Sequence, residues 1–314
     1  MSILQVLKTN DMRLFITALA CLISVSVVGQ TLIPDANFKE YLIGEPLINT
    51  NGDAEIQVSE ATAFNGTIYC ASMNISDLTG IEDFIALTTL YCQGNQLTSL
   101  DVSGATALTT LYCQDNQLAS LDVSSNTTLN YLHCPYNQLT SIDVSANIAL
   151  TVLGCSSNQL TSLDLSNNTA LTNLWCNGNQ LTSLDVSNNT ALTELICNSN
   201  QLTSLDVRNG NNINWGYEGG VFYFHTYGNS NLSCINVDNA YWSTENWTVA
   251  NNNIDPQHYF DTDCYSSNIE ELIVTKKSLT HTLDALGREV NHTTNQILFH
   301  IYDDGSVEKK FIVE

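Results

Sequence analysis

Hydrophobic positions recur along the middle of the chain with a period of 21 residues. Leucine or isoleucine stands at position 87 and at every twenty-first position after it as far as 213. A fixed period of this kind is typical of repeat proteins, in which each coil of a solenoid buries its hydrophobic face against its neighbours. Within a unit, the alternation of Leu90, Tyr91 and Cys92 predicts a short strand with Leu90 and Cys92 inward and Tyr91 outward.

Each unit has the form L-x-x-L-x-C-x-x-N-x-L, the leucine-rich repeat pattern with cysteine in the third apolar position. A second apolar set, Leu97, Leu100 and Val102, closes the other wall of the coil. The sequence therefore predicts an α/β-type solenoid dominated by strand and coil. Its expected form is a leucine-rich repeat horseshoe with a parallel β-sheet on the concave face, followed by a small C-terminal β module.

The asparagines of the pattern are expected to bond the backbone of their own coil and of the next one, because a buried amide needs such partners. They are Asn95, Asn116, Asn137, Asn158, Asn179 and Asn200.

The cysteines of the pattern are predicted to be core residues. Cysteine is a small apolar residue that is often buried, and a short coil has less interior room than longer repeats. In-register parallel strands hold Cβ atoms about 5 Å apart, whereas a disulfide needs about 3.8 Å. No C-x-x-C pair occurs, which disfavours redox chemistry and metal binding. The predicted ladder is Cys92, Cys113, Cys134, Cys155, Cys176 and Cys197.

Over roughly residues 68–237 these units resemble the cysteine-ladder leucine-rich repeats of internalin J-type bacterial surface adhesins. The resemblance implies this repeat fold and a binding role at a cell surface. It does not imply a particular ligand. After an insertion at 214–220, the segment VFYFHTYGNSNL reads as a last coil with Thr226 at the cysteine position.

Residues 1–30 are predicted to be a signal peptide, since the apolar run LFITALACLISVSVVGQ ends in small residues near Gly29 and Gln30. A lipoprotein site at Cys21 is the alternative. No other segment approaches the length of a membrane span.

Residues 271–314, after a linker at 265–270, are predicted to form a separate β module. Alternation in ILFHIY and VEKKFIVE around the turn at 303–305 predicts a hairpin. The patterns D-A-L-G-R-E (284–289) and Y-D-D-G-S-V-E-K-K (302–310) resemble the C-terminal sorting domain of the type IX secretion system of Bacteroidetes. The resemblance implies export across the outer membrane by that machinery, followed by surface attachment or release. An ordinary terminal β module is the alternative.

The formal net charge is −23, and Arg208 is the one cation between Lys39 and Lys276. Nucleic acids and anionic membranes are therefore poor partners. Part of the acidity is a ladder whose carboxylates are expected to accept bonds from backbone N–H groups of the following turn. A row of weak divalent-cation sites is the alternative. The ladder is Asp101, Asp122, Asp143, Asp164, Asp185 and Asp206.

Residues 31–67 are predicted to form an N-terminal helical cap that contains a degenerate EF-hand-like loop. Ala54 stands where the loop wants glycine, so a structural cap without metal competes with a calcium site. The candidate calcium ligands are Asn49, Asn51, Asp53, Glu55 and Glu60.

Residues 238–264 are predicted to form the C-terminal cap, with Cys234 and Cys264 as the candidate disulfide of an exported protein.

The sequence contains no catalytic motif, so we expect a protein that is not an enzyme and has no cofactor beyond possible calcium. Outward positions on the strands vary from coil to coil and are rich in aromatic residues, which suit protein hot spots and sugar stacking. We therefore predict a protein or polysaccharide ligand on the concave face. The candidate residues are Tyr91, Tyr112, Tyr131, His133, Asn173, Trp175, Glu194 and Ile196.

Three alternatives remain at this stage. The tyrosines could serve only to stabilise the sheet by cross-strand pairing. The solenoid could be a structural spacer of the outer surface without a ligand. A regular threonine row on the other wall would suit binding to ice or to another flat surface; it comprises Thr98, Thr140, Thr161, Thr182 and Thr203.

Overall fold

The computed structural model forms two compact units, Met1–Thr262 and Asp263–Glu314. The predicted linker and nearly all of the predicted signal peptide lie outside the residues that the structure describes. Those residues are 29–215, 217–218, 221–264, 279–284, 287–290, 296–303 and 305–312.

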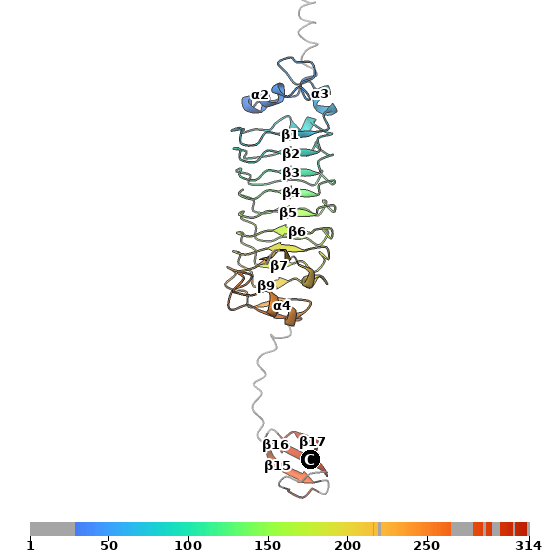
Figure 1. Ribbon diagram of the computed structural model, residues 1–314, viewed down its shortest axis with the longest axis vertical. Coiled ribbons are helices and arrows are strands. Elements are labelled where there is room, and N and C mark those ends of the chain that lie inside the picture. The colour runs from blue at the N-terminus through green and yellow to red at the C-terminus, as the bar shows by residue number, and fades with distance from the viewer. Residues whose placement is uncertain are drawn as a thin grey trace, which may run out of the picture. The chain divides into compact units, whose positions relative to one another are not determined.

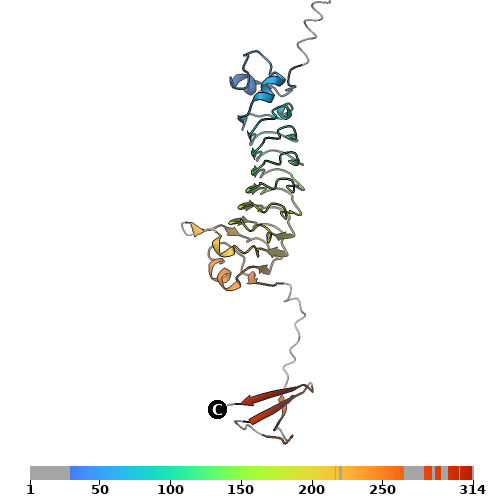
Figure 2. The same ribbon diagram turned by 90° about the vertical axis from the view of Figure 1, so that its right-hand side faces the viewer.

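The first unit is a solenoid whose coils stack one on another (Figures 1 and 2). One wall is a parallel eight-stranded sheet in the order β1-β2-β3-β4-β5-β6-β8-β12, in which equivalent residues of successive coils pair, as Leu90 does with Leu111. The strands are β1 (Thr67–Tyr69), β2 (Thr89–Tyr91), β3 (Thr110–Tyr112), β4 (Tyr131–His133), β5 (Val152–Gly154), β6 (Asn173–Trp175), β8 (Glu194–Ile196) and β12 (Phe224–His225).

The second wall includes a parallel four-stranded sheet in the order β14-β13-β9-β7. Its strands are β7 (Ser183–Asp185), β9 (Ser204–Asp206), β13 (Cys234–Asn236) and β14 (Tyr259–Asp261). In earlier coils this wall contains an isolated parallel bridge between Asp101 and Asp122.

The hydrophobic core lies between the two walls. In the second coil Leu90, Cys92, Leu97 and Val102 are fully buried, while Tyr91 is half-buried on the outer side. The predicted alternation and the predicted solenoid are therefore confirmed. Thr226 is also fully buried and takes the cysteine position of the last coil, as the sequence indicates.

The repeat asparagines tie neighbouring coils together. Asn116 donates its amide to the carbonyl of Cys113 in its own coil (3.1 Å) and to that of Cys92 in the preceding coil (3.0 Å). Its side-chain oxygen accepts the backbone N–H of Leu97 at 3.0 Å. After the insertion Asn229 repeats this role, accepting from Leu202.

A second buried asparagine ladder, which the sequence reasoning did not identify, supports the turn after the second wall. Asn147 donates to the carbonyls of Val123 and Asn126, at 3.0 and 2.8 Å. The ladder members are fully buried: Asn126, Asn147, Asn168 and Asn189.

The N-terminal cap consists of α2 (Ala36–Gly44) and α3 (Val58–Ala63), and η1 (Ile81–Asp83) follows β1. The carboxylate of Asp35 caps α2 by accepting the N–H groups of Asn37 and Phe38. The hydroxyl of Tyr41 accepts the N–H of Tyr69 at 2.8 Å, so the cap helix also engages the outer edge of β1.

The C-terminal end carries η2 (Asn212–Asn214), a hairpin of β10 (Tyr217–Glu218) and β11 (Val221–Phe222), and α4 (Ala240–Asn246). The Phe224 and Trp247 rings stack with centroids 4.1 Å apart and close the core. Cys234 and Cys264, the candidate disulfide residues, are both disulfide-bonded.

The second unit is an antiparallel sheet of β15 (Leu279–Asp284), β16 (Gln296–Tyr302) and β17 (Val307–Ile312). The pairing of Ile301 with Val307 confirms the predicted hairpin. Asp284, from the motif at 284–289, is buried and accepts a hydrogen bond from the Arg288 guanidinium at 2.7 Å.

We predict that Asn158→Ala lowers the free energy of unfolding by about 2 kcal/mol, because it leaves the buried N–H of Leu139 without its partner. The carbonyls of Cys134 and Cys155 also lose a bond, but they keep those from Asn137 and Asn179. Equilibrium urea denaturation measures the change. Exposed Asn167 provides the control, Asn167→Ala, which should shift stability by less than about 0.5 kcal/mol. Equal effects at the two positions would contradict the role of the ladder.

Candidate binding surface on the strand face

We call the outward side chains of β1 to β6 and β8 the strand face; it is the surface that the sequence predicts to be concave. The middle residue of each strand is buried and the flanking residues point outward. In-register pairing aligns these residues into two rows. One row is Thr89, Thr110, Tyr131, Val152, Asn173 and Glu194, and the other is Tyr91, Tyr112, His133, Gly154, Trp175 and Ile196.

Six rings on this face contact one another and form what we call the aromatic stripe. Tyr91 and Tyr112 are stacked with centroids 4.8 Å apart, and Tyr112 and Tyr131 are stacked at the same distance. This separation equals the spacing of strands in a sheet, about 4.8 Å. The stripe comprises Tyr69, Tyr91, Tyr112, Tyr131, His133 and Trp175.

Gly154 allows the stripe to continue past β5. The rings of His133 and Trp175 meet edge to face over it, with centroids 5.8 Å apart. A Cβ atom at Gly154 would lie 2.4 Å from Cδ2 of His133 and 3.2 Å from Cε3 of Trp175. The absence of a side chain in this coil therefore creates the contact between rings two coils apart.

Glu194 fixes the orientation of Trp175. One carboxylate oxygen accepts the indole N–H at 2.8 Å, and the other accepts the amide of Asn173. Ile196, the strand neighbour of Trp175, is half-buried beside it. The structure thus brings together on one face all eight predicted binding residues.

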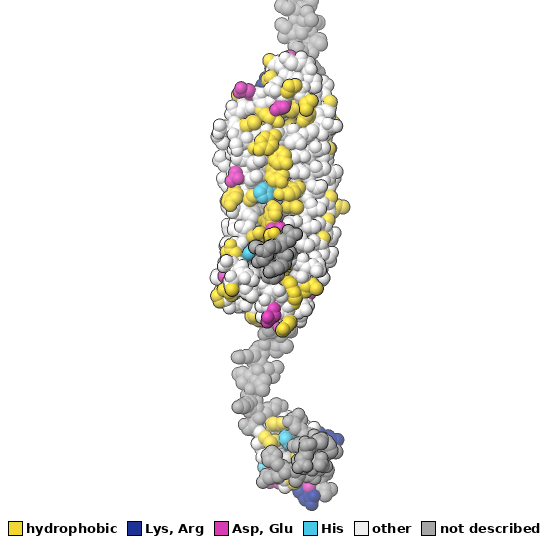
Figure 3. Space-filling model, viewed as in Figure 1, with side chains coloured by type: hydrophobic (Ala, Val, Ile, Leu, Met, Phe, Trp, Pro, Cys, Tyr) yellow, Lys and Arg dark blue, Asp and Glu magenta, His cyan; other side chains and the backbone are white. Residues whose placement is uncertain are grey.

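Stacking covers ring faces in the middle of the stripe. Tyr91 lies between the rings of Tyr69 and Tyr112, and Tyr112 lies between Tyr91 and Tyr131. Figure 3 shows the result as a band of hydrophobic side chains that runs down the strands. Because neighbouring rings occupy their faces, the central tyrosines offer edges and hydroxyl groups to a ligand.

Burial shifts the pKa of two residues of the stripe. It lowers the pKa of His133, against the opposing effect of Asp115, so the imidazole is neutral. Burial and a hydrogen bond with Tyr112 raise the pKa of the Tyr131 hydroxyl.

Tyr69 and Gly154 are parts of this surface that the sequence reasoning missed. Tyr69 stands 22 rather than 21 residues before Tyr91, so it falls outside the strict period. Gly154 gives no signal in the sequence, because its importance depends on the two rings that meet over it.

The cysteine ladder offers no reactive group. Seven described cysteines are free and buried: Cys70, Cys92, Cys113, Cys134, Cys155, Cys176 and Cys197. Burial raises the pKa of Cys155 and of Cys197 to about 12, so both thiols are protonated at neutral pH. Because the thiolate is the nucleophile and the metal ligand, the ladder is a packing device. Cys70 extends the ladder by one coil; it stands 22 residues before Cys92, the same spacing as that between Tyr69 and Tyr91.

The aspartate ladder lies on the second wall, and its carboxylates accept bonds from the following turn as predicted. The oxygen of Asp101 accepts the N–H of Ser103 at 2.9 Å. Hydrogen bonds from the serine two residues later lower the pKa of Asp101 and of Asp122. The threonines of the alternative flat face are exposed on this wall too.

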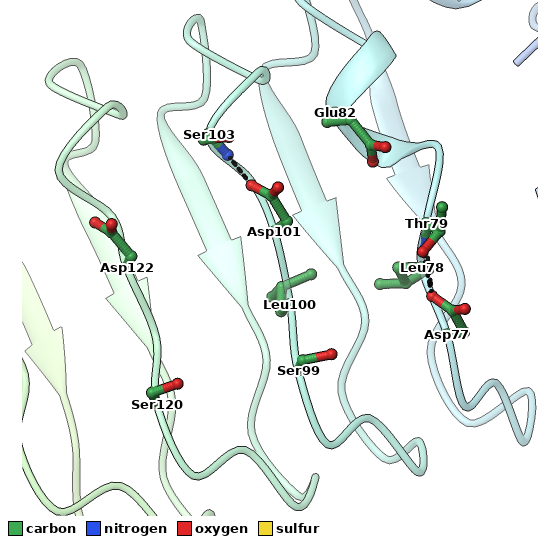
Figure 4. Close-up of a pocket in the computed structure, with 10 residues that line it drawn as sticks. All are labelled: Asp77, Leu78, Thr79, Glu82, Ser99, Leu100, Asp101, Ser103, Ser120 and Asp122. Atoms are coloured by element: carbon green, nitrogen blue, oxygen red, sulfur yellow. Dashed lines mark hydrogen bonds between the residues drawn. The ribbon is translucent and has the colours of Figure 1, made fainter. Parts of the chain in front are cut away.

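A cavity of about 460 Å³ opens on this wall (Figure 4). Asp77, Asp101 and Asp122 line it from successive coils, and Asp77 and Asp101 bond to the backbone of their own turns. Among the residues that the structure describes, no group of three or more His, Cys, Asp or Glu is arranged to hold a metal ion.

The side chains of the EF-hand-like loop bond to the protein itself. Glu60 accepts the N–H groups of Thr50, Asn51 and Gln57 and forms a capping box at the start of α3. The Asn49 amide donates to the carbonyl of Asp53 at 2.9 Å.

The remaining candidate ligands are engaged in the same way. The side-chain oxygen of Asn51 accepts the N–H of Asp53. Glu55 pairs with Lys39 at 2.6 Å. The protein therefore closes this loop with its own donors, and a calcium ion there stays a prediction from the sequence.

The 21-residue coils, the asparagine and cysteine ladders and the parallel sheet define a leucine-rich repeat fold with a cysteine ladder. No helix in the described part of the chain has the length and apolar character needed to cross a membrane.

Several solved structures are similar to this chain. The functional domain of InlJ from Listeria monocytogenes, which includes a cysteine ladder, is 32% identical over 65% of this chain and 50% of its own length, with a TM-score of 0.47. Internalin C2 from the same organism is 20% identical over 67% of this chain and 98% of its own, with a TM-score of 0.43. The Leptospira interrogans leucine-rich repeat protein LIC12759 is 21% identical over 50% of this chain and 52% of its own, with a TM-score of 0.37.

The chain thus spans half the length of the InlJ structure. No protein-family model and no curated protein matches it.

We predict that Glu60→Gln destabilises the protein at neutral pH by about 2 kcal/mol, because hydrogen bonds to a charged group are lost. Burial raises the pKa of Glu60, and bonds from Gln57, Thr50 and Asn51 outweigh this effect, so its pKa lies below 4.5. A lowered folded-state pKa stabilises the fold above the unfolded pKa, and the stabilisation is lost as pH falls through the folded pKa.

Stability of the wild type should therefore fall more steeply than that of Glu60→Gln below about pH 4.5. Thermal melts against pH test this, with exposed Glu45→Gln as the control. Repeating the melts with calcium and with a chelator tests whether this loop binds calcium. We expect the same melting temperature in both, whereas a higher melting temperature with calcium would support a calcium site.

Proposed function

We propose that the chain is an exported binding protein that recognises a protein partner through the aromatic stripe on its strand face. The observation that carries this proposal is the continuous array of contacting rings between Tyr69 and Trp175. Large apolar bands on a protein surface are characteristic of interaction sites, and tyrosine and tryptophan dominate protein hot spots.

A protein partner is favoured over a polysaccharide because sugars stack on open ring faces. In the middle of the stripe Tyr112 stacks with both Tyr91 and Tyr131, and Tyr91 also contacts the ring of Tyr69. Ring edges and hydroxyl groups in a row suit the side chains of a protein surface, which can pack against apolar edges and form hydrogen bonds with the phenol oxygens.

The pre-organisation of Trp175 separates this proposal from a spacer role. A spacer needs only a stable sheet, which stacked tyrosines supply. Glu194 holds the indole by its N–H, and Gly154 leaves room for its contact with His133. A rigid aromatic residue that is already ordered loses little conformational entropy on binding.

The decisive experiment is a binding screen of immobilised cell-surface proteins and polysaccharides against four forms of the protein. They are the wild type, Tyr112→Ala with Trp175→Ala, Gly154→Ala, and Tyr136→Ala with Tyr241→Ala. Tyr136 and Tyr241 are 60% and 80% exposed and belong to no ring contact of the stripe, so they form the matched control.

We expect a protein ligand whose affinity falls at least about 30-fold in the double stripe variant and is unchanged in the control. Gly154→Ala keeps every aromatic residue and should also weaken binding, because its Cβ separates His133 from Trp175. Melting curves show whether each variant is folded. Equal binding by the folded stripe variants, or binding only to polysaccharide, would contradict the proposal.

We also propose that the second unit directs export through type IX secretion. The motifs at 284–289 and 302–310 support this, as does the hydrogen bond from Arg288 to Asp284 at the end of β15. The disulfide-bonded Cys234 and Cys264 fit an oxidising, extracytoplasmic location.

Deleting residues 271–314 should trap the protein in the periplasm of a host with this machinery, measured by cell fractionation. Replacement of the aspartate ladder residue Asp143 by Asn serves as an unrelated control. Normal surface delivery of the truncated chain would refute the role of the tail.

A further inference from the structure

The strand face carries negative charge and no compensating cation. Asp115 and Glu194 lie beside its central section, where His133 and Trp175 meet. No Lys or Arg occupies an outward position of β1 to β6 or β8, and Arg208 is the one cation between residues 40 and 275. Arg208 pairs with Asp206 in the second wall.

The carboxylate of Glu194 is oriented and has accepting capacity left. Each of its oxygens accepts one hydrogen bond, from Trp175 or from Asn173. A carboxylate offers about four lone-pair sites, so each oxygen can accept a further donor. Both existing donors are neutral groups, so they do not neutralise the Glu194 carboxylate, which lies beside the indole of Trp175.

Asp115 supplies the second charge on the opposite side of His133. The residue is exposed, on a turn with φ of 55°, and its carboxylate acts electrostatically on the imidazole. The imidazole is neutral at neutral pH because burial lowers its pKa. The other rings of the stripe are uncharged as well, so two carboxylates set the charge of this section.

We propose that the protein partner presents a cationic contact surface. Its arginine or lysine side chains lie beside Glu194 and Asp115, and its apolar side chains pack against the tyrosine edges. This inference rests on the proposed function. Charge complementarity with the strand face, within a chain of net charge −23, is what selects a basic partner.

The chemistry favours arginine at Glu194. A planar guanidinium donates to a carboxylate in a fork and is weakly hydrated, so it tolerates an aromatic surface better than an ammonium group does. Its aliphatic stem can pack on the stripe. The net negative charge of the chain adds long-range attraction, which raises the association rate at low salt.

The test uses the full chain as bait for a random peptide library displayed on phage, panned at neutral pH and low salt. Bound clones are then measured against Glu194→Gln, Asp115→Asn and Asp143→Asn, and against Tyr112→Ala with Trp175→Ala. Asp143→Asn removes the same charge from the exposed second wall, so it controls for net charge. Asparagine tolerates a positive φ, so Asp115→Asn keeps the turn.

We expect the selected peptides to be enriched in arginine and lysine. Their affinity should fall about tenfold in Glu194→Gln and in Asp115→Asn, and hardly at all in Asp143→Asn. Added salt should weaken wild-type binding more than binding to Glu194→Gln or Asp115→Asn.

Two results would overturn the inference, and they are distinguishable. Peptides that need the stripe but lack basic residues, or that bind Glu194→Gln and Asp115→Asn as tightly as the wild type, would refute the cationic partner and leave the proposed function intact. A library that yields no stripe-dependent peptide would count against both. Indole fluorescence of Glu194→Gln shows whether Trp175 keeps its environment.

Discussion

The hydrogen bonds of the repeat asparagine determine the geometry of this protein. One carboxamide, as in Asn116, joins two carbonyls in adjacent coils and receives an N–H from the coil before it. Each bond is buried, so a coil that slipped out of register would leave several polar groups without partners. Strict register then aligns outward residues into rows at strand spacing, and Tyr91 and Tyr112 stack for that reason. The binding surface is thus a consequence of the ladder inside the coil.

The cysteine ladder and the caps solve two further problems of a short coil. Cysteine at Cys113 fills the interior without the bulk of leucine, and its burial keeps the thiol protonated. The caps cover the ends of the core, where Tyr41 bonds the edge of β1 and Trp247 stacks on Phe224. Without such caps a solenoid would expose apolar core and open strand edges.

Periodicity made most of the fold predictable, because features repeated in every coil reveal themselves by spacing. The inward cysteines, the first asparagine ladder and the position of Thr226 in the last coil all follow from it. The second asparagine ladder, which starts at Asn126, is harder to predict, because a turn position rich in asparagine is typical of solvent-exposed backbone. The first coil is one residue longer, which hid Cys70 and Tyr69. The spacing of Glu60 from Asn49 fits the last ligand position of a calcium-binding loop. Its actual role is to cap the start of α3, and the spacing alone does not show where that helix begins.

The candidate site was predictable as a set of residues but not as a surface. Ring orientation follows from side-chain rotamers, and it decides that Tyr112 presents an edge rather than a face.

The most direct test places a photo-crosslinking amino acid at Ile196 on the strand face or at Thr161 on the second wall, in protein displayed on its native cell surface. Mass spectrometry then identifies the adducts formed with the surrounding medium and cells. A protein adduct at Ile196 and none at Thr161 is the predicted result. Adducts at Thr161 alone, or none at either position, would contradict the assignment of the strand face as a protein-binding surface.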